Sequence, residues 1–384
     1  MYELPQHSEP GFWLQLLRKH GWWLGLVLVL DLILVGCWLT QSEPAPAPVT
    51  SIQPAPTVVE QEPEPEPEPG FRIGFPTPQT RLVETNSLEV YMATGSGRVE
   101  SAWYGSVRTR KYRSSYLPSF HEGVDIAPTA RDARGRALDD VFAVADGTVG
   151  YINRVAGNSS YGIYVVLLHE SRLGEVFTLY AHLASASDSL RVGQPVTRGD
   201  IIGRMGHTST LGIPVQRSHL HFEFGTVLNR RFETWFRGKK LKPNHGMLHG
   251  YNLTGLNPMG LFDYMAEEKR FDPLNYIKAA PVAFRMVVPT DTLPDYYQRY
   301  PALWVGEPAT GGAMVMEVSE GGVPLFARAA TDEEKARISN RKPVVLEVFP
   351  DILGRNGERL VVKRNGEWQP GRKAEQWLDI LLYR

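Results

Sequence analysis

Two histidines one residue apart, His219 and His221, start a segment that is typical of a β-strand. Side chains along a strand alternate between its faces, so both imidazoles point to one side while Leu220 and Phe222 point to the other. Such a pair suits a metal site, because a strand holds its ligands more firmly than a loop does. A lone pair of this kind is also compatible with a half-polar strand that binds nothing, so the decision depends on the rest of the chain.

Further groups suited to zinc binding or proton transfer precede this pair. They are His121 and Asp125 in the stretch FHEGVD, and His182 in the stretch TLYAHL. Catalytic zinc takes three protein ligands from His nitrogen and carboxylate oxygen and keeps one position for water, whose pKa it lowers from about 15.7 toward 7. Imidazoles that are not ligands can accept and return protons near neutral pH. Three ligands and two proton-handling groups therefore account for the whole set.

The segments that must position these groups have the sequence pattern of β-strands. Runs of apolar, β-branched and aromatic residues alternate with glycine-containing turns, and no long amphipathic helix interrupts them. We therefore predict a mainly β, antiparallel-sheet domain over residues 71–280, with one helical piece near residues 260–270. The strand-like runs are residues 88–92, 141–152, 163–169, 176–182, 201–205 and 219–225.

Residues 281–384 predict a separate small α+β domain whose role the sequence does not identify. Thr331, followed by acidic residues, is typical of a helix start. Wall binding, partner docking and autoinhibition are equally open for this domain, because its sequence carries no motif with evident chemistry. The strand candidates are residues 313–318, 344–349, 359–362 and 377–382.

Residues 21–39 form a long apolar run. At about 1.5 Å rise per residue, the run is just long enough to cross a membrane as a helix. Arg18 and Lys19 precede it, so the positive-inside rule places an N-tail of residues 1–20 in the cytoplasm and everything after the run outside. We predict an uncleaved transmembrane anchor over residues 21–40.

A second interpretation competes at the end of the apolar run. The tetrapeptide from Leu34 to Cys37 resembles a lipobox, where a bacterial lipoprotein precursor is cleaved before a lipidated cysteine. Residues 41–70, rich in proline and glutamate, predict an extended spacer that carries the following domain away from the bilayer. Both interpretations export the chain and tether it to a membrane.

Composition excludes several classes of function. The net charge of −1 gives no overall field for nucleic acid, so no nucleic-acid partner is expected. Cys37 is the single cysteine, which excludes an internal disulfide and a cysteine-based zinc cluster. A basic and aromatic stretch over residues 230–242 is interpreted as a solvated face or a contact with an anionic wall polymer.

The ordered motifs resemble a known family. H-x-x-x-D at residues 121–125, Y-x-H at 180–182 and H-x-H-F-E at 219–223 are similar to the LytM/lysostaphin-type zinc peptidases, which cut peptide cross-links in bacterial peptidoglycan. The resemblance covers roughly residues 95–225. Further similarity lies in the AVADGTVGYI and VGQPVTRGDIIGRMG stretches.

The resemblance implies a role for each group. By motif position, His121, Asp125 and His221 are the expected zinc ligands, and His182 and His219 are the expected catalytic histidines. The implied activity is a zinc metalloendopeptidase in the bacterial cell envelope, anchored by its N-terminus, with peptidoglycan as substrate on the periplasmic or cell-wall side.

The sequence departs from the family before the last motif. Residues 206–217 are longer than the usual glycine turn, which leaves the shape of the substrate groove open. His207 in this segment is expected to be a loop residue. The main alternative is a non-catalytic relative that binds the wall and activates another hydrolase. A cupin-like enzyme fits less well, because its H-x-H pair precedes the remaining ligands, and the bond cleaved stays open.

Overall fold

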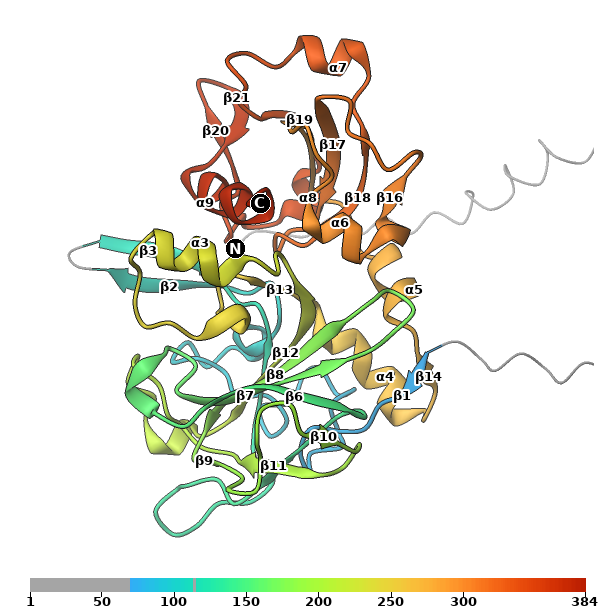
Figure 1. The fold of residues 1–384 in the computed structure, drawn as a ribbon. Helices are drawn as coiled ribbons and strands as arrows, with labels where there is room; N and C mark the ends of the chain where they lie inside the picture. Colours follow the sequence, from blue (N-terminus) through green and yellow to red (C-terminus); the bar gives the residue numbers. More distant parts are fainter. Residues whose placement is uncertain (1–69, 113–114) are drawn as a thin grey trace, which may run out of the picture. The chain divides into compact units, whose positions relative to one another are not determined.

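The structure is a computed structural model that describes residues 70–112 and 115–384. These described residues form one compact unit, built mainly from antiparallel strands (Figure 1). The mainly β prediction is confirmed. The predicted membrane anchor and nearly all of the predicted linker lie outside the described residues. Among the residues that are described, no helix has the length and apolar character needed to cross a membrane.

A seven-stranded sheet forms the centre of the unit. Its order is β10-β6-β7-β8-β12-β13, with the short β4 also paired to β12, and every pairing is antiparallel. The predicted strands at 163–169, 176–182 and 219–225 are confirmed within two residues. The strands are β4 (Val124–Ile126), β6 (Gly147–Asn153), β7 (Ile163–His169), β8 (Val176–Leu183), β10 (Pro195–Val196), β12 (Leu220–Val227) and β13 (Leu253–Leu256).

Strand β12 is buried along its whole length. Leu220, Phe222 and Phe224 alternate onto one face and join the main hydrophobic core. His221 and Glu223 lie on the opposite face. At this point β8 and β4 are the strands that pair with β12. The period of two along this strand therefore separates an apolar face from a face that carries chemistry.

Short sheets and hairpins surround the central sheet. The prediction of one continuous strand over 141–152 is wrong. Residues 143–146 interrupt it, and the segments before and after this bend belong to two different sheets. The strand predicted over 88–92 is also wrong: Val90 and Tyr91 donate backbone hydrogen bonds to Ser87 and form a turn. The additional strands are β1 (Phe71–Arg72), β2 (Val107–Tyr112), β3 (Ser115–Phe120), β5 (Asp140–Phe142), β9 (Ser185–Ala186), β11 (Ile201–Arg204) and β14 (Arg270–Phe271).

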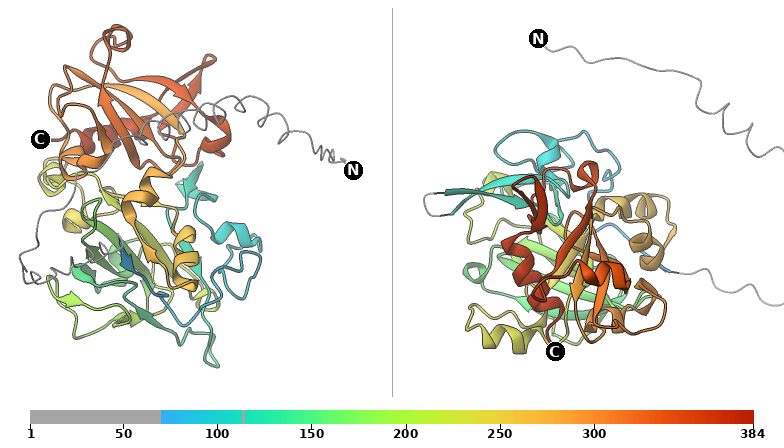
Figure 2. Two further views of the ribbon diagram at one scale, coloured as in Figure 1. Left: turned by 90° about the vertical axis from the view of Figure 1, so that its right-hand side faces the viewer. Right: turned by 90° about the horizontal axis from the view of Figure 1, so that it is seen from above.

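The C-terminal region contains a five-stranded sheet in the order β16-β18-β17-β15-β19 and a hairpin of β20 and β21. In Figures 1 and 2 its orange and red elements lie against the green and yellow elements of the central sheet. The strands are β15 (Phe284–Pro289), β16 (Trp304–Val305), β17 (Ala313–Val318), β18 (Pro324–Ala329), β19 (Val344–Val348), β20 (Val361–Arg364) and β21 (Glu367–Pro370).

Short helices cap and connect these sheets. The helix start at Thr331 is confirmed, since its hydroxyl accepts the backbone N–H of Glu334 in a capping box. The helices of the described region are α3 (Phe232–Gly238), α4 (Leu261–Ala266), α5 (Pro273–Lys278), α6 (Asp295–Arg299), α7 (Asp332–Ala336), α8 (Pro350–Leu353) and α9 (Arg372–Leu381).

The strand predicted over residues 377–382 is wrong, because this segment belongs to α9. Its buried apolar residues are Ala374, Trp377, Leu378, Ile380 and Leu381, and most of them are spaced three or four apart. That spacing places them on one side of a helix rather than on alternate faces of a strand.

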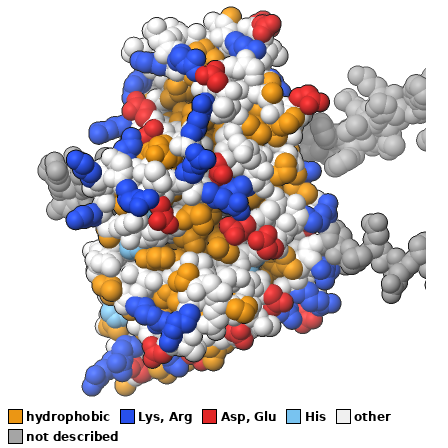
Figure 3. Space-filling model, viewed as in Figure 1, with side chains coloured by type: hydrophobic (Ala, Val, Ile, Leu, Met, Phe, Trp, Pro, Cys, Tyr) orange, Lys and Arg blue, Asp and Glu red, His pale blue; other side chains and the backbone are white. Residues whose placement is uncertain are grey.

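The basic and aromatic stretch forms α3 and the residues around it. Phe232, Trp235 and Phe236 are buried, whereas the basic side chains from Arg230 to Lys242 are exposed. On the face drawn in Figure 3, Lys and Arg side chains stand out over this region. The aromatic residues therefore anchor the helix, and contact between the charges and an anionic wall polymer stays a prediction.

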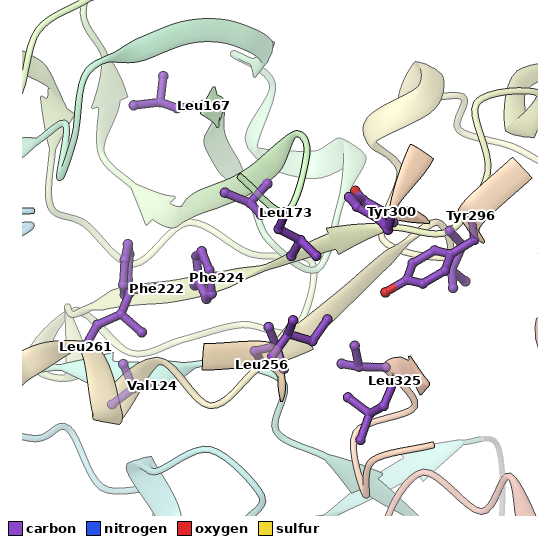
Figure 4. Packing of buried hydrophobic residues seen from close by; sticks show 14 of the residues in the cluster. Val124, Leu167, Leu173, Phe222, Phe224, Leu256, Leu261, Tyr296, Tyr300 and Leu325 are labelled. Carbon is purple, nitrogen blue, oxygen red and sulfur yellow. The ribbon is translucent and has the colours of Figure 1, made fainter. Parts of the chain in front are cut away.

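One hydrophobic core extends across residue 280. It contains Phe224 and Leu256 of the central sheet together with Tyr296, Tyr300 and Leu325 of the C-terminal region (Figure 4). The hydroxyl of Tyr300 donates a 2.7 Å hydrogen bond to the backbone carbonyl of Glu175. The division into two domains at residue 280 stays a prediction. Residues on the two sides of this position pack together in one core.

Buried polar contacts also cross residue 280. The side-chain amide of Asn229, which is fully buried, donates 2.8 Å hydrogen bonds to the backbone carbonyls of Ile380 and Tyr383. The indole N–H of Trp235 donates to Asp379 at 2.9 Å. Removing the C-terminal region would leave these donors without partners.

A chain of residues 70–280 is expected to lack a stable fold, because it would expose the part of the shared core that the C-terminal region covers and the buried amide of Asn229. Far-UV circular dichroism and a thermal melt, with residues 70–384 as control, measure this. A cooperative melt of the shorter chain, near that of the control, would show that the shared core is dispensable.

Candidate metal centre

Three side chains from separate segments converge beside β12: His121, Asp125 and His221. Nε2 of His121 lies 3.0 Å from Oδ1 of Asp125 and 3.1 Å from Nδ1 of His221. Nδ1 of His221 lies 2.9 Å from the same Asp125 oxygen. All three residues are buried, and two nitrogens with one carboxylate oxygen form a donor set that catalytic zinc uses.

Strand pairing explains this convergence. Asp125 lies in β4 directly opposite His221 of β12. His121 follows β3 and reaches the same point four residues before Asp125. The backbone register therefore fixes two donors, and the chain entering β4 supplies the third.

The second ring nitrogen of each ligand histidine has an acceptor. Nδ1 of His121 donates to the backbone carbonyl of Trp103 at 2.9 Å, and Nε2 of His221 donates to Oε1 of Glu223 at 2.7 Å. With a metal bound, these bonds would favour the tautomer in which the nitrogen facing the cluster has a lone pair. Tyr161 supports Glu223 through a 2.8 Å hydrogen bond from its hydroxyl.

The charges around the cluster suit a bound cation. Burial raises the pKa of Asp125, but His121 and Arg108 outweigh it and hold that pKa well below the usual range, so the carboxyl is ionised. Nη2 of Arg108 donates to Oδ2 of Asp125 at 2.6 Å, which leaves Oδ1 for the cluster. Burial lowers the pKa of His121 to about 4, which keeps this ring neutral as a ligand must be.

His221 experiences the opposite balance. Burial lowers its pKa, but hydrogen bonds to Asp125 and Glu223 outweigh burial and raise the pKa to about 9. Two carboxylates thus stabilise a positive charge at this ring. A metal cation would take the place of the Nδ1 proton, so the residues present fit a divalent metal.

The two predicted catalytic histidines lie next to this cluster. Nε2 of His219 is 3.5 Å from Oδ1 of Asp125, and its Nδ1 donates to the carbonyl of Arg217 at 2.7 Å. The rings of His182 and His219 have centroids 4.9 Å apart, and the ring of His182 is 5.7 Å from that of His221. The structure therefore brings all five predicted site residues together.

The backbone of His182 is unusual. Its φ of 60° lies in the left-handed region, which a non-glycine residue rarely adopts. Its Nδ1 donates to the carbonyl of Thr208 at 2.9 Å, and the Thr208 hydroxyl is itself fixed by Leu183 and the N–H of Ile163. Burial holds the pKa of His182 well below its usual value, so the ring is neutral.

Sequence reasoning missed the groups that orient the site. Arg108, Tyr161 and the carbonyls of Trp103 and Thr208 come from loops and strands whose proximity the motifs do not encode. Glu223 lies on the same strand face as His221 and is bonded to it. His207 is a loop residue, as predicted, with Nδ1 bonded to the carbonyl of Ile213.

Comparison with known proteins supports the resemblance. Residues 119–233 match the family model of peptidase family M23, and this stretch contains every histidine and aspartate of the cluster. The similarity to the LytM/lysostaphin-type peptidases is thereby confirmed. None of the curated proteins compared with the chain matches it.

Several solved structures show similarity to part of the chain. The catalytic domain of lysostaphin from Staphylococcus simulans is 20% identical, over 42% of this chain and 89% of that one, with a TM-score of 0.26. A putative glycyl-glycine endopeptidase lytM from Ruminococcus gnavus is 18% identical, over 45% and 65%, with a TM-score of 0.25. Csd3 from Helicobacter pylori is 20% identical, over 52% and 40%, with a TM-score of 0.25.

The variant His121→Ala is expected to lose bound metal, whereas His182→Ala should retain it, because only His121 contributes a donor to the cluster. Zinc content per chain, measured by atomic absorption after dialysis, tests the assignment. Loss of zinc from His182→Ala, in a protein that still melts like the wild type, would contradict it.

Glu223→Gln should weaken zinc affinity by about 10- to 100-fold, because it removes the charged acceptor that orients His221. Tyr161→Phe should have a smaller effect, since it removes only the support of Glu223. Competition with a chromogenic chelator measures both. Equal affinities for wild type and Glu223→Gln would show that this carboxylate does not tune the site.

Proposed function

We propose that this protein is a zinc endopeptidase of the bacterial cell envelope that hydrolyses peptide cross-links of peptidoglycan. The observation that carries the proposal is the convergence of His121, Asp125 and His221 with two further histidines beside them. The match of residues 119–233 to peptidase family M23 supports a peptidase. The envelope location rests on the apolar run over residues 21–39 and is part of the proposal.

His121, Asp125 and His221 would hold the zinc ion. When bound, zinc acts as a Lewis acid toward water and toward the carbonyl of the scissile peptide bond. The donor set leaves room in a tetrahedral site for one exchangeable ligand, which a hydrolytic site requires. Glu223 and Trp103 keep the two imidazoles in the orientation that this role needs.

His182 and His219 would handle protons and charge. Each donates Nδ1–H to a backbone carbonyl, so Nε2 of each ring is the nitrogen that can exchange a proton with the substrate. The neutral His182 is suited to accept a proton from the attacking water and to return it to the amine nitrogen as the C–N bond breaks. With a proton on Nε2 as well, His219 could donate a hydrogen bond to the developing oxyanion.

Incubating zinc-loaded residues 70–384 with isolated peptidoglycan should release uncross-linked fragments, identified by mass. His182→Ala, which should retain zinc, is expected to lower the rate by about 100-fold or more because it removes an acid–base group. Removing zinc with a chelator should stop release, and adding zinc should restore it.

Two controls make the assay decisive. His121→Ala should release nothing, which would exclude a contaminating hydrolase. No release by the zinc-loaded wild type would contradict the proposal and favour the alternative, a wall-binding activator of another hydrolase.

A further inference from the structure

Two guanidinium groups lie beside the candidate metal centre. Arg108 is bonded to Asp125, as described above. Arg217 is held on two sides: its carbonyl accepts the 2.7 Å hydrogen bond from His219, and its Nε donates to the carbonyl of Ala93 at 3.2 Å. Met92, next to Ala93, donates its N–H to the carbonyl of Asp125 at 2.9 Å. Arg217 is therefore fixed next to the cluster by its own backbone and by its side chain.

The backbone around Arg217 is also held in place. It ends a short 3₁₀ turn, Val215–Arg217, that closes the long 206–217 segment. The next residue, Ser218, is completely buried, and its carbonyl accepts a 3.0 Å hydrogen bond from Arg131. The 206–217 segment thus delivers a guanidinium to the edge of the site. A preorganised cation loses little entropy when it binds a ligand.

The charge of Arg217 is not neutralised by a direct ion pair in the part of the chain whose side chains are described. Both oxygens of the nearby Asp125 are engaged, Oδ2 by Arg108 and Oδ1 by the histidines. Elsewhere, Arg299 and Arg328 each pair with a carboxylate at 2.7 Å. Arg217 is half-buried and uses only its Nε for Ala93, so its two Nη groups can bind an incoming anion.

The sum of charges favours an anionic ligand. Asp125 and Glu223 contribute two negative charges to the centre, and Arg108 and Arg217 contribute two positive ones. A divalent metal adds two more positive charges, so the loaded site has a net positive charge. A carboxylate is the group that matches the paired N–H donors of a guanidinium.

We propose that Arg217 is a subsite for a carboxylate of the peptide substrate, adjacent to the bond that is cleaved. This inference rests on the proposed endopeptidase function and specifies its substrate class: an acidic stem peptide with a free carboxylate near the cross-link. A chain of glycines offers no such group within its length. The subsite therefore favours cleavage next to an acidic residue over cleavage within an uncharged glycine bridge.

The test uses two synthetic cross-linked stem-peptide dimers that differ only in whether the carboxyl groups next to the cross-link are free or amidated. Zinc-loaded residues 70–384 should cleave the acid with kcat/KM at least about tenfold above the amide, as expected for a hydrogen bond to a charged group. In Arg217→Gln this ratio should fall to within about twofold of unity. Arg217→Lys, which keeps the charge but not the paired donors, should give an intermediate ratio.

Arg72→Gln is the matched control, because Arg72 is exposed on β1, and it should keep the wild-type ratio. Cleavage of both dimers by the wild type with equal kcat/KM would overturn the subsite while leaving the endopeptidase intact. The subsite proposal would also be contradicted if the Arg217→Gln variant kept the wild-type preference for the acid.

A binding measurement tests the carboxylate subsite independently of the cleavage reaction. If the wild type cleaves neither dimer, the proposed endopeptidase activity fails, and calorimetry on the zinc-loaded protein still tests the subsite. N-acetyl-D-alanyl-D-alanine should then bind at least about tenfold more tightly than its C-terminal amide, and Arg217→Gln should abolish the difference. Equal affinities of the wild type for the two peptides would overturn the subsite.

Discussion

The structure depends on the burial of an ionised carboxylate. This group, Asp125 of β4, lies next to the face of β12 that carries the histidines. A buried charge is costly unless it is paired and hydrogen-bonded. Arg108 satisfies one oxygen of Asp125, and the imidazoles of His121 and His221 surround the other. The same arrangement that makes burial tolerable also creates a point where three donor atoms meet. Stability of this region and affinity for a cation therefore have a common electrostatic origin.

The C-terminal region takes part in building this site. Glycines of the C-terminal region lie against the segment that precedes His121: Gly321 packs on Tyr104, and Gly357 packs on Val107, so closely that a Cβ at either position would clash. That segment supplies the Trp103 carbonyl and the Arg108 guanidinium that orient the ligands. Together with the shared core, these contacts connect residues after 280 to the candidate metal centre through packing. The region is better understood as part of the scaffold than as an appended module.

The long 206–217 segment has two functions that the family motifs do not suggest. Its beginning positions His182 through the carbonyl of Thr208, and Gly162 must remain a glycine because a Cβ there would clash with that carbonyl. Its end carries Arg217 to the edge of the cluster. One loop thus orients a proton-handling group and sets the charge next to it. A change in loop length could alter both the rate and the choice of substrate.

The sequence by itself pointed to the candidate site residues and to most of the strands that carry them. The motifs identified His121, Asp125, His182, His219 and His221, and the period of two along β12 separated its apolar and polar faces, because both properties are local. Only the tertiary structure decided that Arg108 and Tyr161 reach Asp125 and Glu223, because these groups come from separate segments of the chain. It also decided that residues 377–382 are helical and that one core extends across residue 280, because packing partners far away in the sequence select among local alternatives.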